Sequence, residues 1–215
     1  SVNLLAETVR EMNAANVPFS VSIGDGFEWT QEAANILEEQ LLSLIPDYIN
    51  QKQEAIDCGL FSFHVADYFP KYPMKKIAVC GKSNNIVAYD IDGSPCICHM
   101  FSELVLGKHM ARKAWNDCSN IKTIPFDEGC SDCPIHKNCK HCFGENMKQF
   151  GTIYQTAARK TICNAIKAKA RACAFFALKQ MEQKIRNNEL LTKQEETDFE
   201  KALKLLEVIP SFLKI

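Results

Sequence analysis

Hydrophobic and polar positions in the first fifty residues switch from a helical spacing to an extended one and back. Apolar residues recur every three to four positions over residues 3–15, which predicts a helix. Over residues 18–24 they alternate with serines, which predicts a strand. Thr30 is a suitable N-cap for a second helix that runs to about Ile45, before Pro46. Helix, strand and helix in this order are typical of the last unit of an α/β barrel or doubly wound sheet.

The pattern changes after the prolines near residue 70, where short apolar runs of strand-like composition appear. Residues 77–80 and 86–91 are such runs, and Asp92-Gly93 is a turn signal before residues 94–99. These segments predict a small antiparallel meander. A short helix is predicted over residues 102–115.

The rest of the chain divides into a cysteine-rich loop and a helical end. Residues 121–151 have no clear periodicity and read as a loop, whereas residues 153–186 form a long alanine-rich helical pattern. Thr192 and Glu195 have the spacing of a capping box, which predicts a last helix over residues 193–206. The predicted fold class is therefore α/β, or more broadly α+β.

Composition excludes several classes of protein. The chain has 215 residues and a formal net charge of -1, so no strong field favours nucleic acid or an anionic membrane. No apolar run approaches the ~20 residues of a membrane span, and no signal peptide opens the chain, so a cytoplasmic location is expected. The chain has eleven cysteines, an odd number, and is large enough to fold without disulfide bonds. Thiolate ligation is therefore favoured over disulfides.

The densest cysteines follow the pattern Cys130-x2-Cys133-x5-Cys139-x2-Cys142. Closely spaced cysteines in an irregular loop can direct several thiolates toward one centre, and thiolates select iron–sulfur clusters or zinc. Structural zinc usually joins two Cys-x2-Cys pairs across a longer gap, whereas short intervals are common in cluster-binding loops. The spacing favours iron–sulfur clusters and leaves a structural zinc-binding interaction module without enzymatic activity as the alternative.

The cysteines outside this loop extend the pattern. Cys80 precedes Gly93-x4-Cys98, and Cys163 follows the loop after a gap of twenty residues. Over roughly residues 77–165 this layout resembles the SPASM domain, the auxiliary cluster domain of many radical S-adenosylmethionine (radical SAM) enzymes. The last loop interval departs from the family pattern, because it is x2 and not x3. The local sequence around Cys133-Pro and Cys142-Phe-Gly is most similar to that of peptide maturases, in particular the group associated with CXXX-repeat targets.

The resemblance implies a ligand set for two [4Fe-4S] clusters. Cys80, Cys98 and Cys142 would hold the first, and Cys130, Cys133, Cys139 and Cys163 the second. The first would then lack a fourth ligand, for which Cys96, Cys118 or a substrate thiolate are the candidates.

The resemblance also implies a domain order and an activity. The expected parts are the end of a radical SAM barrel (1–56), a connector (57–78), the cluster domain (79–165) and a C-terminal helical extension (166–215). The Cys-x3-Cys-x2-Cys motif that binds S-adenosylmethionine and a third [4Fe-4S] cluster is absent from the sequence. We therefore expect the C-terminal portion of a longer radical enzyme, inactive alone. The parent would crosslink a ribosomally made precursor peptide by a thioether or carbon–carbon bond, with flavodoxin or ferredoxin as its reductant.

Several further residues have plain interpretations beside the functional ones. Cys58 and Cys173 are expected to pack as small hydrophobes. His99 adjoins a predicted ligand, but a surface position or a hydrogen bond to cluster sulfur is expected of it, and not the role of a base. His136 and its neighbours Lys137, Lys140 and His141 read as solvated charge around the thiolates, and Asp25-Gly26 reads as a turn.

Overall fold

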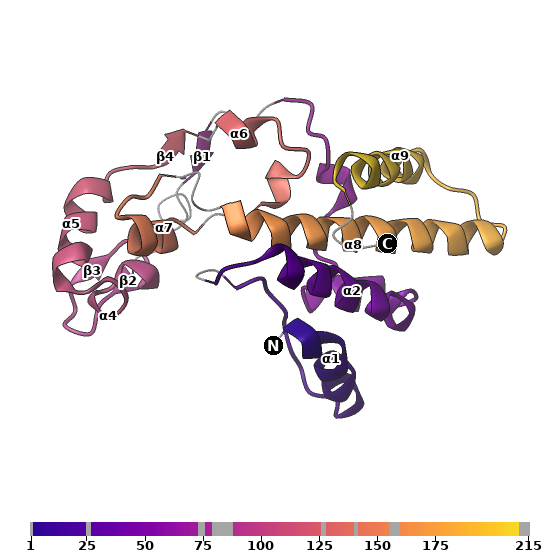
Figure 1. The fold of residues 1–215 in the computed structure, drawn as a ribbon, viewed down its shortest axis with the longest axis horizontal. Helices are drawn as coiled ribbons and strands as arrows, with labels where there is room; N and C mark the ends of the chain where they lie inside the picture. Colours follow the sequence, from indigo (N-terminus) through magenta and orange to yellow (C-terminus); the bar gives the residue numbers. More distant parts are fainter. Residues whose placement is uncertain are drawn as a thin grey trace. The chain divides into compact units, whose positions relative to one another are not determined.

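The computed structural model describes residues 2–24, 27–72, 76–78, 88–125, 128–139, 142–154 and 160–210. The chain folds into two compact units (Figure 1). Unit 1 contains residues 1–71, 137–139 and 160–215, and unit 2 contains residues 72–136 and 140–159. The fold is mixed, with many helices and few short strands, and belongs to the α+β class.

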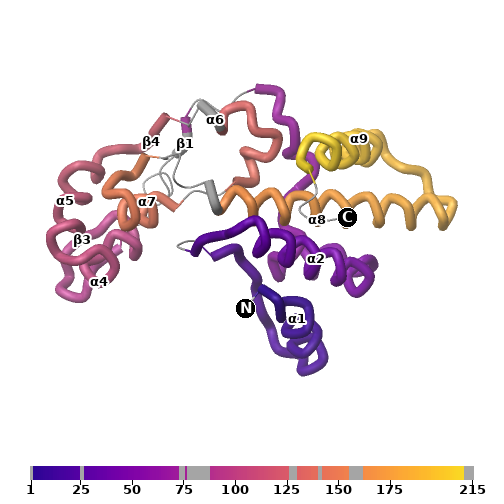
Figure 2. Tube along the Cα trace, in the orientation of Figure 1, coloured from indigo at the N-terminus to yellow at the C-terminus, as the bar shows by residue number. Residues whose placement is uncertain are grey.

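Unit 1 is helical in the part that the structure describes. Its elements are η1 (Val2–Leu4), α1 (Leu5–Ala14), α2 (Gln31–Tyr48), α3 (Lys52–Asp57), η2 (Val65–Asp67), α8 (Lys160–Arg186) and α9 (Lys193–Val208). Helix α8 packs against α2 and α9, and α1 packs against α2, as the tube in Figure 2 follows. Buried aromatic contacts help to join these elements, since the rings of Phe61 and Phe176 stack with centroids 4.3 Å apart.

The two N-terminal helices confirm the periodic pattern of the sequence. Helix α2 begins where expected, because the Thr30 hydroxyl accepts a hydrogen bond from the Ala33 amide at 3.1 Å. Pro46 does not end the helix, which continues to Tyr48. Proline near the last turn removes only one amide donor, and Leu44, Ile45 and Tyr48 remain buried.

The strand predicted over residues 18–24 is wrong, since no strand is assigned there. The Val21 amide donates a 2.7 Å hydrogen bond to the Cys58 carbonyl, and no neighbouring strand pairs with the segment in the described residues. Gly59 makes this approach possible: it has a φ of +84°, and a Cβ there would lie 2.3 Å from the Val21 oxygen. Alternation predicted an extended backbone, but a strand also needs a partner.

The C-terminal helices close unit 1 by packing on the N-terminal segment. The capping box of α9 is present as predicted, with Thr192 and Glu195 each accepting a hydrogen bond from the other's backbone amide. Arg171 on α8 lies 2.8 Å from Glu38 on α2, and both side chains are almost fully buried. The Arg171 guanidinium also donates to the backbone carbonyls of Leu206 and Ile209 at the end of α9. Arg171 thus joins α8 to α2 through an ion pair and to the end of α9 through hydrogen bonds.

Unit 2 is built from short elements. They are β1 (Lys76–Ala78), β2 (Ala88–Tyr89), β3 (Pro95–Cys96), η3 (His99–Phe101), α4 (Glu103–Leu106), α5 (Lys108–Cys118), β4 (Thr123–Pro125), α6 (Glu128–Ser131) and α7 (Phe143–Phe150). A further short helix, η4 (His136–Asn138), begins in unit 2 and ends in unit 1.

The strands of unit 2 form two antiparallel pairs. Strands β2 and β3 pair across the turn at Gly93, which confirms the hairpin that Asp92-Gly93 predicted. Strand β1 pairs with β4, so Ile77 lies opposite Ile124. Within the described residues β1 pairs with β4 and not with β2, so only the β2–β3 pair of the expected meander is present there; residues 79–87 of the predicted runs lie outside the described part of the chain.

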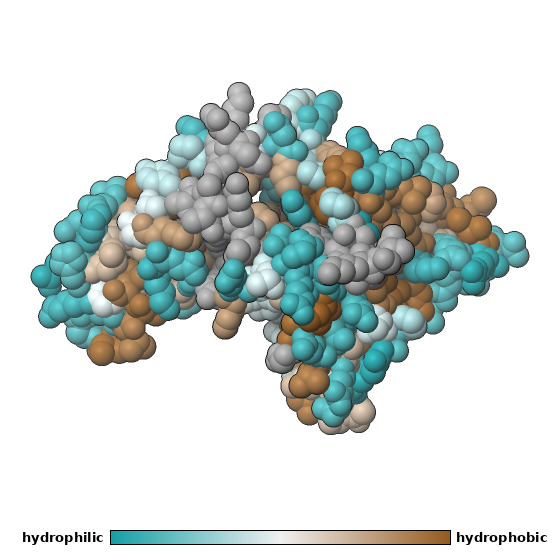
Figure 3. All heavy atoms as spheres, viewed as in Figure 1, coloured by the Kyte–Doolittle hydropathy of each residue, from teal (hydrophilic) through white to brown (hydrophobic). Residues whose placement is uncertain are grey.

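The core of unit 2 gathers side chains from several of these elements. Its buried members are Ile97, Phe101, Ala114, Cys118, Ile124, Phe143, Met147 and Ile153. The helix predicted over residues 102–115 is divided at Gly107, whose φ of 74° ends α4 and begins α5. Figure 3 shows hydrophilic side chains over the outward face of α5, which carries Lys108, Arg112 and Lys113. Across the described chain, no helix combines the length and the apolar character needed to cross a bilayer.

Candidate metal centre

Cys98 begins a tight turn in unit 2. The cysteine stands directly before η3, and its carbonyl accepts a 2.8 Å hydrogen bond from the Phe101 amide. The backbone N–H groups of Met100 and Phe101 also donate to its sulfur. Amide donors directed at a cysteine sulfur stabilise the thiolate form, which is the form that binds metals. The backbone donors of the turn therefore offset part of the rise in the pKa of Cys98 that burial causes.

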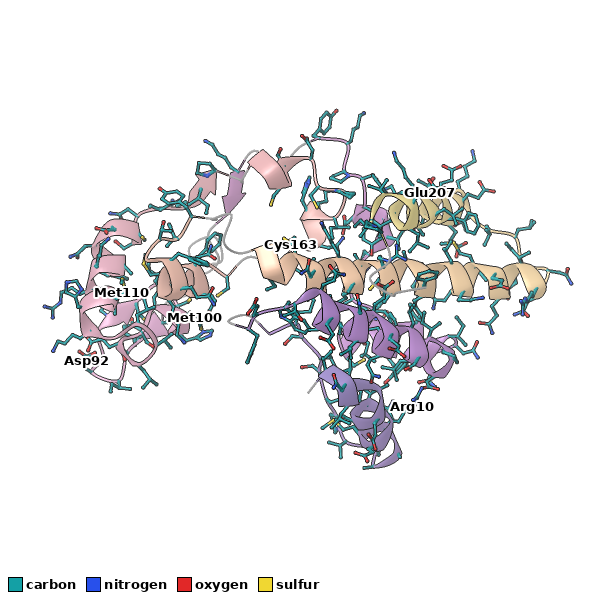
Figure 4. The ribbon with its side chains drawn as sticks, viewed as in Figure 1. Arg10, Asp92, Met100, Met110, Cys163 and Glu207 are labelled. Atoms are coloured by element: carbon teal, nitrogen blue, oxygen red, sulfur yellow. The ribbon has the colours of Figure 1, made fainter. Side chains whose placement is uncertain are left out.

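Cys142 is the N-cap residue of α7. Its carbonyl accepts a 3.1 Å hydrogen bond from the Asn146 amide, so the first turn of the helix starts at this cysteine. The start of a helix carries a partial positive charge from unpaired amides, which favours negatively charged groups in general; the Cys142 side chain makes no cap hydrogen bond. Helix α7 lies against η3, and Figure 4 shows Met100 beside it.

The two cysteines are neighbours although the chain between them forms several other elements. Burial is the largest influence on Cys98 and raises the pKa of its thiol; the nearby Cys142 sulfur raises that pKa further, while the two backbone donors lower it. The Cys142 sulfur thus disfavours ionisation of Cys98, and a bound cation would reduce that repulsion. The two cysteines are therefore candidate ligands of one metal.

A complete metal site is not formed within the described residues. No group of three or more histidine, cysteine, aspartate or glutamate side chains in those residues gathers closely enough to hold a metal ion. The third ligand predicted for the first cluster, Cys80, lies outside the described part of the chain. Of the three predicted ligands, Cys98 and Cys142 lie near each other in the described residues, and their role as ligands stays a prediction.

Cys130 and Cys133 lie in unit 2 at the end of α6. They form a turn in which the Cys133 amide donates to the Cys130 carbonyl at 3.1 Å, and both side chains are partly exposed. The Cys133 carbonyl accepts from the His136 amide and from the ring Nδ1 of His136, both at 3.1 Å. His136 is only 3% exposed, so its interpretation as a solvated residue is wrong. The imidazole supports the cysteine turn.

Cys139 and Cys163 lie in unit 1, and both are partly exposed. Two contacts hold the segment before Cys139 to unit 1: Asn138 donates to the His64 carbonyl at 3.4 Å, and Lys137 pairs with Asp67 at 3.7 Å. Cys163 lies in the first turn of α8 (Figure 4). The four cysteines predicted for the second cluster are therefore divided between the units, and that ligand set stays a prediction. Lys140, His141 and the Asp25-Gly26 turn fall outside the described residues.

The two candidates for a fourth ligand of the first cluster differ in their surroundings. Cys96 is buried; burial raises the pKa of its thiol most, followed by Asp90 and then Cys98. Cys118 is a member of the unit 2 core, and burial followed by Asp117 raises the pKa of its thiol. Of these two cysteines, Cys96 is the one whose pKa Cys98 raises, and the choice of a fourth ligand stays a prediction.

The remaining predictions concern residues with plain roles. Cys173 is 2% exposed, which confirms that it packs as a small hydrophobe, and burial raises its pKa to about 11. Cys58 is half-buried at the C-terminus of α3, with its thiol 3.5 Å from the Ala55 carbonyl. His99 is exposed, as a surface residue would be.

Comparison with known proteins adds no relative: no protein-family model matches the chain, and no curated protein or solved structure matches it.

Proposed function

We propose that the chain is the auxiliary iron–sulfur portion of a radical SAM enzyme that modifies a ribosomally made peptide. Cys80, Cys98 and Cys142 would hold one [4Fe-4S] cluster. The second set would be Cys130, Cys133, Cys139 and Cys163. When bound, the clusters would accept or deliver single electrons, or hold a substrate thiolate at an open iron. The chain's own residues would position the sulfurs.

The neighbouring sulfurs of Cys98 and Cys142 are the observation that supports this proposal most. Cys98 and Cys142 are far apart in sequence. The predicted ligand pattern assigns both to the same cluster. Two backbone amides beside the Cys98 sulfur would offset part of the cost of burying its thiolate, although burial leaves the pKa of Cys98 raised, and Cys142 lies at the start of a helix. The peptide substrate, the radical reaction and the reductant protein rest on the resemblance of the cysteine pattern.

Anaerobic purification of the full chain tests the metal. We expect brown protein that contains iron and acid-labile sulfide, with several irons per chain after reconstitution. Colourless protein with stoichiometric zinc, even after anaerobic reconstitution with iron and sulfide, would instead identify a structural zinc module. Protein that retains neither metal would contradict both.

The first ligand set has its own test. Cys98→Ser and Cys142→Ser should each lower the iron content, because each removes a thiolate from the same centre. Cys58→Ser is the matched control, since Cys58 lies in unit 1 and is in neither predicted set. Equal iron in all four proteins would show that the pair binds no cluster.

A further inference from the structure

Gly144 lies where unit 2 has no room for a side chain. The residue is buried in the first turn of α7, and a Cβ built on it would lie 2.3 Å from the Met100 Cβ. The Met100 carbonyl carbon and oxygen would each be 3.3 Å from that Cβ. Unlike Gly93, Gly107 and Gly151, Gly144 has no positive φ, so its backbone does not require glycine. The close approach of Met100 is what excludes a larger residue.

This contact joins the two elements that carry the cysteine pair. Met100 follows Cys98 by two residues in η3, and Gly144 follows Cys142 by two residues in α7. The distance between the backbone of η3 and the start of α7 therefore sets how closely the two sulfurs can approach. Phe101 follows Met100 and Phe143 precedes Gly144, and both phenylalanines are buried in the unit 2 core. The two elements are therefore both anchored in that core.

We propose that Gly144 is a positioning residue that brings the Cys98 and Cys142 sulfurs within reach of one thiophilic metal ion. This inference rests on the proposed function for the identity of the ligand, but the positioning itself concerns only the protein. Ordinary van der Waals contact begins near 3.4 Å, so an alanine at position 144 must move away from the Met100 Cβ by 3.4 − 2.3 = 1.1 Å.

A shift of this size is large for a metal centre. Metal–sulfur distances in protein sites vary by only about 0.2 Å around their preferred values. Groups that orient a ligand typically change metal affinity by about 10- to 100-fold when they are altered. We expect Gly144→Ala to weaken metal binding at the pair by this factor. Its effect on the helix itself has the opposite sign, because alanine favours a helix over glycine.

The experiment uses the full metal-free chain and Cd²⁺ as the probe. Cd²⁺ is titrated, exposed thiols are alkylated, and mass spectrometry of peptides reports the protection of Cys98 and Cys142 separately from the other cysteines. In Gly144→Ala, half-protection of both should require about 10- to 100-fold more Cd²⁺ than in the native protein. Lys148→Ala is the matched control, because Lys148 is exposed on the same helix and should leave protection unchanged.

A second variant separates positioning from general damage to the fold. Met100→Gly removes the Cβ that lies 2.3 Å from the added one, so Gly144→Ala combined with Met100→Gly should recover most of the lost protection. Met100→Gly alone gives the reference for that comparison. Where Cd²⁺ protects the native pair, protection of Gly144→Ala within twofold of the native value, or a loss that Met100→Gly does not reverse, would overturn the proposal.

Oxidation of the metal-free protein with diamide separates the positioning role of Gly144 from metal binding by the cysteine pair. Diamide accepts two electrons and two protons as the Cys98 and Cys142 thiols join in a disulfide, whose yield reports their proximity without metal. A lower yield in Gly144→Ala, restored by Met100→Gly, supports the positioning role even if the native pair takes no Cd²⁺; that result would count against the metal site alone. An unchanged yield in Gly144→Ala would refute the positioning role.

Discussion

Replacing Glu38 with leucine should destabilise unit 1 more than any surface change in α2. The Glu38 carboxylate lies 2.8 Å from Arg171, and the two side chains are 0% and 6% exposed. Leucine has a similar volume but leaves the Arg171 guanidinium buried without its carboxylate. Breaking one partner of a buried pair typically costs about 3–5 kcal/mol, a large share of the ~5–15 kcal/mol that stabilises a domain.

The two tryptophans allow this effect to be measured in unit 1 alone. Trp29 lies in unit 1 and Trp115 in unit 2, and the chain has no others. In a Trp115→Phe background, urea unfolding followed by Trp29 fluorescence reports unit 1. With a urea m-value of about 2 kcal/mol/M, a loss of about 4 kcal/mol lowers the midpoint by about 2 M.

Two further variants decide whether the buried charge is the cause. Glu39→Leu changes an exposed neighbour on the same helix and should shift the free energy of unfolding by less than about 0.5 kcal/mol. Glu38→Leu with Arg171→Met removes both charges and should cost less than Glu38→Leu alone, although the Leu206 and Ile209 carbonyls lose their donor. A cost below about 1 kcal/mol for Glu38→Leu, or a double variant as unstable as the sum of both single changes, would refute the reasoning.

Two other changes probe the C-terminal helices. Thr192→Ala removes the side-chain cap of α9 and should cost about 1 kcal/mol in urea unfolding, whereas Thr197→Ala, an exposed mid-helix control, should cost little; equal costs would exclude the capping box as the cause. Burial raises the Cys173 pKa from 9.0 to about 11, so the thiol loses its proton more easily in the unfolded chain than in the native one. Its contribution is complete below pH 9 and is lost as the pH rises through 11, about 3 kcal/mol in total. Stability should therefore fall more steeply over this range in the native protein than in Cys173→Ala, and parallel curves would contradict the assignment.

The elements that could be predicted are those whose causes are local. Caps at Thr30 and Thr192 act within one turn, and the Asp92-Gly93 turn pairs the strands beside it, so α2, α9 and the β2–β3 hairpin confirm the sequence pattern. The strand predicted over residues 18–24 is wrong because alternation indicates an extended backbone but does not supply a pairing strand. Strands β1 and β4 are separated in sequence by several other elements, and no local pattern reports a pairing between such distant segments.

Helix α7 was missed within a segment interpreted as a loop. Cysteines and glycine hid its amphipathic pattern, yet Phe143 and Met147 are one helical turn apart and both are buried. That spacing was the available signal. The cysteine pattern grouped Cys98 with Cys142, but their proximity results from the packing of η3 against the start of α7, where Gly144 admits Met100. The sequence shows a glycine after Cys142 without showing which residue it faces.

Iron analysis of paired variants is the most direct test of two separate clusters. Anaerobically reconstituted native protein, Cys98→Ala, Cys133→Ala and the double variant are compared for iron and acid-labile sulfide per chain. Two independent clusters predict that each single change removes one cluster and leaves the other, and that the double variant loses both. Loss of all iron in either single variant, or no loss in both, would contradict the assignment of these cysteines to two separate centres.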